Sequence, residues 1–216
     1  MDKNQEAIIQ KTVDFVKATL SDTDASHDWW HIYRIWQLSK HIAQTENVDL
    51  FVVELGALLH DISDWKNNSG DSTVGAKIAA DFLKKQNVNE KIILAVKHIL
   101  ENISFKGISD NSNMETIEGK IIQDADKLDA IGAIGIGRCF TYGGYKEFPM
   151  HDPEIIHNKE EFGKRFSKTS INHFHEKLLL LKDLMNTETG KSLAQHRHEC
   201  MEQFLLEFHK EWDGEL

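Results

Sequence analysis

Apolar side chains recur at helical spacing along most of the chain. In the opening segment they follow the i, i+3, i+4 pattern of one helix face at Ile8, Ile9, Val13, Phe15, Val16 and Leu20. The same periodicity predicts helices over about 29–45, 50–61, 72–86, 90–102 and 115–128, the last continuing or bending into 130–140. The segment 50–61 is apolar nearly all round, so we expect it to be central. The pattern predicts an all-α fold.

The segment from 141 to 168 interrupts this periodicity. It holds both prolines of the chain, the glycine pair at 143 and 144, and mixed charge. Irregular segments of this length in compact proteins are usually lids, binding loops or disordered. Helical periodicity then resumes at Thr169 or Ser170, runs to Met185, and returns after a turn in a last helix over about 191–212.

The chain shows no internal repeat, no low-complexity tract and no clear domain boundary. We therefore expect one domain over residues 1–216, a helical bundle with a C-terminal helical extension. Within it we expect a core over about 20–140, the irregular segment over about 141–168, and C-terminal helices over 169–212.

Charge limits the partners that the chain can take. With 25 Lys and Arg against 35 Asp and Glu, the formal net charge is −10. No basic field is available to displace counterions, so we expect neither nucleic acid nor a membrane surface as a partner. A small phosphorylated ligand is not excluded, because a metal ion and a few local cations can offset its charge.

Cysteine usage and hydropathy indicate a cytoplasmic location. Cys139 and Cys200 match no metal-binding or redox spacing, and we expect reduced thiols. The first residues contain no apolar signal core, and no stretch approaches the ~18 apolar residues of a membrane span.

Three fragments carry metal-binding residue types inside apolar helical stretches. They are HDWWHIYRIW with His31, LGALLHDISDWK with His60 and Asp61, and IIQDADKLDAIGA with Asp126. Imidazole nitrogens and carboxylate oxygens are ligands of divalent transition metals, and buried polar side chains need such partners. A metal held in this way can activate water at neutral pH and neutralise phosphate oxygens.

Each fragment also allows a simpler interpretation. His60 could be a buried histidine bonded to the backbone, with Asp61 capping the next loop. HDWWH superficially resembles the H-E-x-x-H zinc motif of metalloproteases, but such an enzyme needs a third ligand and a Glu base, and the Asp in place of Glu counts against it. The neighbouring carboxylates Asp124 and Asp129 could bond to adjacent helices or to ligand histidines.

Taken together, the fragments resemble the HD-domain metal-dependent phosphohydrolases, and in particular a small bacterial nucleotide (pyro)phosphohydrolase subgroup. The likeness covers nearly the whole chain, including TYGG and NHFHEKLLLLKDLMNTETGK. It implies a helical bundle of the HD type with four metal ligands: His31, His60, Asp61 and Asp126. Mn²⁺ is the ion we expect, with Fe²⁺, Mg²⁺, Co²⁺ and Ni²⁺ as alternatives. At four residues beyond His60, Asp64 matches an acidic residue implicated in proton transfer.

The resemblance implies hydrolysis of (deoxy)nucleoside triphosphates to the monophosphate and pyrophosphate. Substrate contacts are predicted at His27, Lys66, His98, Arg138 and Lys177. Arg138 could instead pair with a structural carboxylate such as Glu101 or Asp129. Alternatives for the same site are a nucleoside monophosphate phosphatase, a phosphodiesterase, or a non-catalytic nucleotide-binding sensor. Whether the chain forms a homodimer is left open.

Overall fold

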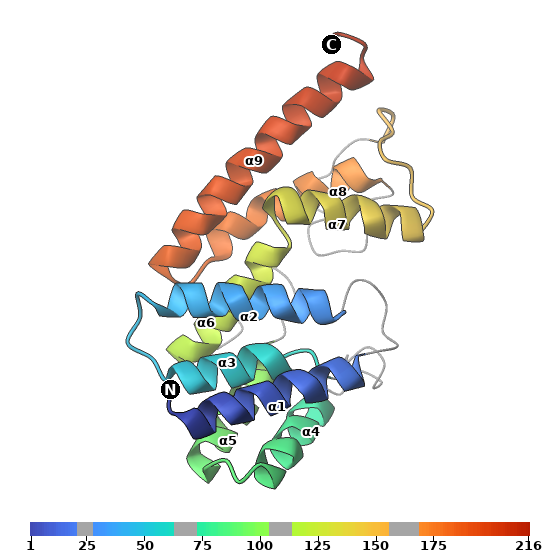
Figure 1. Ribbon diagram of the computed structural model, residues 1–216. Coiled ribbons are helices and arrows are strands. Elements are labelled where there is room, and N and C mark those ends of the chain that lie inside the picture. The colour runs from blue at the N-terminus through green and yellow to red at the C-terminus, as the bar shows by residue number, and fades with distance from the viewer. Residues whose placement is uncertain (21–27, 63–72, 104–113, 156–168) are drawn as a thin grey trace. The chain divides into compact units, whose positions relative to one another are not determined.

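A computed structural model describes residues 1–20, 28–62, 73–103, 114–155 and 169–216. Within these ranges every regular element is a helix, so the predicted all-α fold is confirmed (Figure 1). The chain divides into two compact units, the first comprising Met1–Phe105 with Asn111–Ala125, and the second Lys106–Asp110 with Asp126–Leu216. The single domain expected from the sequence stays a prediction.

Unit 1 contains five complete helices and most of a sixth among its described residues. They are α1 (Lys3–Thr19), α2 (Trp29–Ala43), α3 (Leu50–Leu59), α4 (Thr73–Lys85), α5 (Glu90–Asn102) and the larger part of α6 (Ile117–Asp129). Short polar side chains start five of these helices by accepting backbone N–H groups, as N-caps do: Asp2, Asp28, Asp49, Asn89 and Thr116.

Helix α3 is the centre of unit 1, as predicted. Every residue from Phe51 to Leu59 is buried, and α3 packs against α1, α2 and α5. The side chain of Glu54 is buried among these helices, and its Oε2 accepts a 2.7 Å hydrogen bond from Trp36 Nε1 on α2. This bond ties α2 to α3, the two helices that carry the first two metal-binding fragments.

The described part of unit 2 begins with the last turn of α6. It continues with α7 (Gly132–Tyr145), α8 (Ser170–Glu176), the 3-10 helix η3 (Leu178–Leu184) and α9 (Glu188–Trp212). Helix α9 packs against α7 and η3. Rings from α7, α8 and α9 form a cluster in which Phe174 is fully buried and the others are half-buried: Phe140, Phe174, Phe204 and Phe208.

Two predicted boundaries in unit 2 were wrong. Helix α7 continues through the glycine pair to Tyr145, because Gly143 packs so closely on Ser170 that a Cβ would collide with the serine Oγ. Here glycine permits helix packing and does not end the helix. The helix expected from 170 to 185 changes to 3-10 geometry at Lys177, whose φ of −139° and ψ of −58° leave the α-helical region.

The last helix also begins earlier than predicted. Thr187 and Gly190 were expected to form a turn before a helix at 191. Instead, the Thr187 hydroxyl accepts the backbone N–H of Gly190 at 3.0 Å, and α9 starts at Glu188. The two residues therefore form the N-cap and first turn of the helix.

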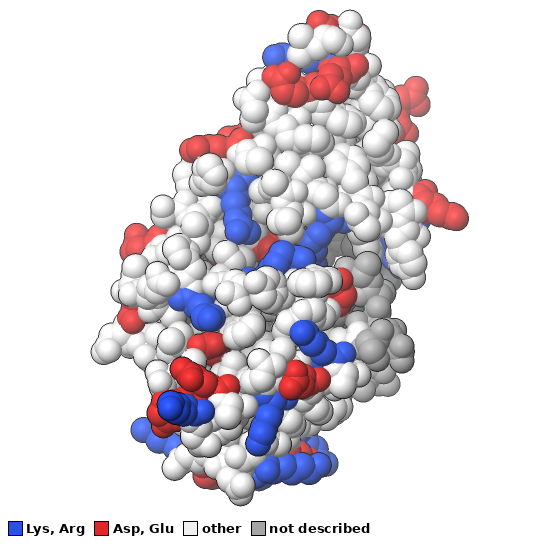
Figure 2. Space-filling model, in the orientation of Figure 1, with Lys and Arg blue, Asp and Glu red and all other residues white. Residues whose placement is uncertain are grey.

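Charges of both signs are interspersed on the face shown in Figure 2. Acidic side chains gather where α9 ends, in a stretch that contains Glu207, Glu211, Asp213 and Glu215 (Figure 2). Among the described residues, no helix has both the length and the apolar composition needed to span a membrane.

The two cysteines are free thiols in different environments. Cys139 is buried, its Sγ lies 3.4 Å from the Ser170 carbonyl oxygen, and burial raises its pKa to about 12. Cys200 is exposed. Because the thiolate is the reactive form, we expect a disulfide reagent at pH 8 to label only Cys200 in the folded protein, and both thiols in denaturant. Thiol titration with mass mapping measures this. Labelling of Cys139 at the rate of Cys200 would contradict it.

His173 on α8 is half-buried, and burial together with the Lys177 charge lowers its pKa from 6.5 to about 4. Between these pH values the unfolded chain binds a proton at this residue and the folded chain does not. The free energy of unfolding therefore falls as pH drops from 6.5 to 4, by about 1–3 kcal/mol from this group. We expect His173→Gln to remove that component. Urea unfolding of both proteins at pH 7 and pH 5 measures it, and an equal pH dependence would contradict it.

Candidate metal centre

His60 follows the last residue of α3 and has one ring nitrogen already committed. Its Nδ1 lies 2.8 Å from the carbonyl oxygen of Ala57. A carbonyl oxygen only accepts hydrogen bonds, so Nδ1 carries the hydrogen and Nε2 of the neutral ring keeps a lone pair. This Nε2 is buried and has no hydrogen-bond partner among the residues that the structure describes. A buried acceptor in this state requires a ligand, and a metal-bound histidine typically has this arrangement.

His31 lies in the first turn of α2. The Asp28 carboxylate caps this turn by accepting the backbone N–H of His31 at 2.9 Å. The His31 side chain is buried, and its ring centroid lies 5.4 Å from that of His60, with the ring planes inclined by 63°. The end of α3 and the start of α2 thus bring two imidazoles together.

Asp126 supplies a carboxylate to the same group. His31, His60 and Asp126 each offer one ligand atom, and these atoms all lie within 4.8 Å of one another. Helix α6 carries Asp126 directly after Ala125, the last residue of unit 1. Two imidazole nitrogens and one carboxylate oxygen are a donor set that suits Mn²⁺, Fe²⁺ and related divalent ions. The buried Nε2 of His60 supports the same fit.

Comparison with known proteins decides the family. The HD domain family matches residues 29–131. YpgQ of Bacillus subtilis strain 168, described as uncharacterized, is 36% identical over 203 residues, which cover 93% of this chain and 91% of YpgQ. The chain belongs to the HD-domain superfamily. All three residues of the metal group lie within the part matched to the HD domain.

Solved structures agree with this membership. A crystal structure of an HD-superfamily hydrolase from Bacillus thuringiensis superposes with a TM-score of 0.79 at 41% identity, covering 97% of this chain and 98% of that one. A crystal structure of Bacillus subtilis YpgQ in complex with ADP superposes with a TM-score of 0.77 at 32% identity, covering 96% of each chain. The predicted HD-type fold is confirmed. Membership of this superfamily supports the prediction that the chain is a metal-dependent phosphohydrolase.

Asp61, the second residue of the HD pair, is half-buried and adjacent to His60. It lies outside the group of three whose ligand atoms are within 4.8 Å of one another. Its role as a fourth ligand stays a prediction. Three other predicted site residues, His27, Asp64 and Lys66, lie outside the described residues.

The remaining predicted substrate residues occupy different environments. His98 is half-buried on α5, with Nδ1 3.5 Å from Asn102 Nδ2. Lys177 is exposed at the change from α8 to η3. Arg138 on α7 donates from Nη1 to the carboxylate and the backbone oxygen of Asp129. The structure therefore shows the pairing of Arg138 with a structural carboxylate, and its contact with substrate stays a prediction.

Sequence reasoning did not single out Arg197 or assign a contact to Lys127. Arg197 on α9 donates to the carbonyl oxygen of Leu128, and the buried Lys127 donates to that of Leu184 at 3.0 Å. Burial lowers the pKa of the Arg197 guanidinium, while the Asp129 carboxylate opposes that shift. No motif could have revealed Arg197, because it acts on a segment 69 residues away in the sequence.

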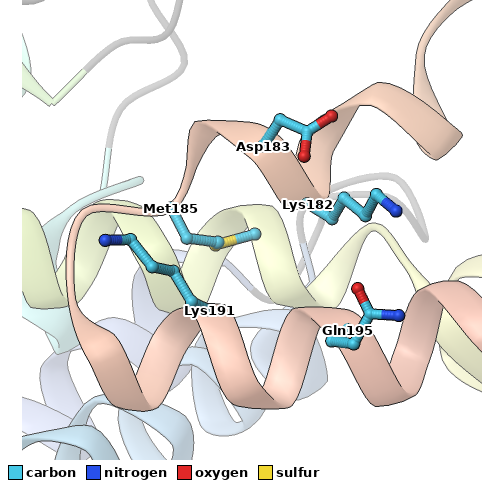
Figure 3. Close-up of a pocket in the computed structure, with 5 residues that line it drawn as sticks. All are labelled: Lys182, Asp183, Met185, Lys191 and Gln195. Atoms are coloured by element: carbon cyan, nitrogen blue, oxygen red, sulfur yellow. The ribbon is translucent and has the colours of Figure 1, made fainter.

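Unit 2 also has an open cavity of about 300 Å³ between η3 and the first turns of α9. Figure 3 shows the five side chains that line it: Lys182, Asp183, Met185, Lys191 and Gln195. One of them, Lys191, already pairs with the Glu188 carboxylate at 2.7 Å. The residues predicted for the HD site are not among the five.

Proposed function

We propose that this HD protein hydrolyses (deoxy)nucleoside triphosphates to the monophosphate and pyrophosphate, with Mn²⁺ as its ion. The observation that carries the proposal is the buried Nε2 of His60, which has no hydrogen-bond partner among the described residues, within the group formed with His31 and Asp126. The ADP bound in the YpgQ crystal structure supports a nucleotide as the ligand. The triphosphate specificity rests on the resemblance of the sequence to the small bacterial subgroup.

In this proposal His31, His60 and Asp126 hold the ion, with Asp61 as the fourth ligand. A bound divalent ion supplies Lewis acidity, which lowers the pKa of a water molecule and offsets phosphate charge. The chain contributes geometry: the Ala57 carbonyl oxygen fixes the His60 ring, and the Asp28 cap fixes the turn that carries His31.

The proton and the phosphate charge require further residues. Asp64 is proposed to accept the proton of the attacking water and to return one to the leaving oxygen. Lys66, with Arg138 or Lys177, is proposed to offset the charge on the phosphates, and His27 and His98 to contact substrate.

Product analysis tests the proposal. Metal-stripped protein is loaded separately with Mn²⁺, Fe²⁺, Mg²⁺, Co²⁺ or Ni²⁺ and incubated with dATP or dGTP, and nucleotides and phosphates are resolved by anion exchange. We expect the monophosphate and pyrophosphate in equal amounts, with the highest rate for Mn²⁺ and none without metal. Parallel reactions contain a nucleoside monophosphate or a cyclic nucleotide. Hydrolysis of either of these without hydrolysis of the triphosphates would replace the proposed reaction. Binding without turnover of any nucleotide would indicate a sensor.

A further inference from the structure

Each of the three residues directly after Asp126 forms a hydrogen bond with another helix of unit 2. Lys127 donates, whereas Leu128 and Asp129 accept. Lys127 Nζ donates to the carbonyl oxygen of Leu184 at the end of η3, at 3.0 Å. Arg197 Nη1 of α9 donates to the carbonyl oxygen of Leu128. Arg138 Nη1 of α7 donates to the carboxylate of Asp129 and, at 3.3 Å, to its carbonyl oxygen.

The three residues of α6 that take part in these bonds are buried, while Arg138 and Arg197 are half-buried. Lys127 is 7% exposed, Leu128 0% and Asp129 1%. The carbonyl groups in the last turn of a helix have no partner within the helix and carry partial negative charge. The Leu128 carbonyl oxygen also accepts the backbone N–H of Ile131 at 3.2 Å, so Arg197 adds a second, charged donor and places a cation at the negative end of the helix dipole.

The turn between α6 and α7 is shaped to admit Arg197. Gly132 has a φ of +74°, and a Cβ at this residue would lie 2.9 Å from the Arg197 Cγ. A side chain at this position would be strained and would push the arginine stem away. The stem thus crosses the turn directly above Gly132 to reach the Leu128 carbonyl oxygen.

We propose that Arg197 is a positioning residue that holds the last turn of α6, and thereby Asp126, in the orientation needed to bind the metal ion. The inference rests on the proposed metal site and extends it to a residue 71 positions further along the chain. A carboxylate ligand must keep its orientation closely, and supporting residues of metal sites serve this purpose. Arg138 and Lys127 hold the same turn from two other elements.

Metal affinity tests this role directly. Arg197→Met keeps the aliphatic stem over Gly132 and removes the donor, whereas Arg197→Lys keeps one cationic donor. Lys210→Met is the matched control, since it removes a cation from α9 whose recorded partner is Glu207 on the same helix. Mn²⁺ affinity is measured by calorimetry, Co²⁺ coordination by visible absorption, and the opening of residues 127–131 by amide hydrogen exchange.

We expect Arg197→Met to weaken Mn²⁺ binding about 10- to 100-fold, as the loss of an outer-shell partner typically does. Hydrogen exchange at 127–131 should accelerate, and excess Mn²⁺ should restore kcat without a change in the nucleotide KM. Arg197→Lys should recover part of the affinity, and Lys210→Met should match the parent protein. Parental Mn²⁺ affinity in folded Arg197→Met would overturn the role, as would a lower melting temperature without a change in affinity.

The outcomes separate this inference from the proposed reaction. If the parent binds Mn²⁺ and Arg197→Met weakens that binding, the positioning role holds even when no nucleotide is hydrolysed. If hydrolysis proceeds as proposed and Arg197→Met keeps parental affinity, only the positioning role fails. A further variant, Arg138→Met, distinguishes the two interpretations of Arg138: it raises the nucleotide KM if the residue contacts substrate, and lowers Mn²⁺ affinity if the residue supports the turn.

Discussion

Asp126→Ala is expected to lower both Mn²⁺ affinity and phosphohydrolase activity by more than about 100-fold while the protein stays folded. Loss of an outer-shell partner of a metal ligand typically lowers metal affinity or activity about 10- to 100-fold, and loss of a direct ligand lowers them more. Asp126 is the carboxylate of the group formed with His31 and His60, so its removal leaves this group with its two imidazoles alone. Calorimetric titration with Mn²⁺ and the initial rate of dGTP hydrolysis measure the two effects.

Two further variants make this result specific. Asp126→Asn keeps the side-chain shape and removes the charge, so it should retain the fold and still lose most of the affinity. Asp81→Ala removes an exposed carboxylate from α4 and should change neither quantity. Parental Mn²⁺ affinity in folded Asp126→Ala would show that the ion, if one binds, is held elsewhere.

Gly135→Ala is expected to lower the free energy of unfolding by about 1–3 kcal/mol, the usual cost of overpacking. A Cβ at Gly135 would collide with the carbonyl oxygen of Ala130, a backbone atom in the turn that precedes α7. No side chain can rotate away to relieve this contact, so the turn itself must move. Urea unfolding followed by circular dichroism measures the change.

The same helix provides the opposite case. A Cβ at Gly137 would meet nothing within 4 Å. Gly137→Ala should therefore raise the free energy of unfolding by about 0.5–1 kcal/mol, since alanine stabilises a helix relative to glycine. Changes of the same sign in the two variants would show that the approach of Gly135 to Ala130 does not determine stability.

Much of unit 1 could be predicted because its signals are local. The all-round apolar character of 50–61 predicted a buried α3. His31, His60 and Asp126 were predicted together from three separate fragments, and the structure brings them together. Imidazoles and carboxylates in apolar helices are unusual enough to be recognised without a structure.

What could not be predicted depends on contacts between distant segments. The glycine pair at 143–144 indicated a helix end, yet the close approach of Ser170 makes Gly143 part of α7. The sequence left substrate and structural carboxylate as alternative partners for Arg138, and the pairing with Asp129 required the fold. Arg197 resembles any other charged residue of an amphipathic helix until the carbonyl oxygen of Leu128 is placed against it.

The unequal exposure of the two thiols has a practical consequence for spectroscopy. Cys200 lies three residues after Arg197 on α9, which places the two residues on neighbouring positions of one helix surface. A fluorophore or nitroxide attached there would not require removal of Cys139, because that thiol is buried. The natural sequence thus offers one reporter position, from which local motion near Arg197 can be followed as Mn²⁺ or nucleotide is added.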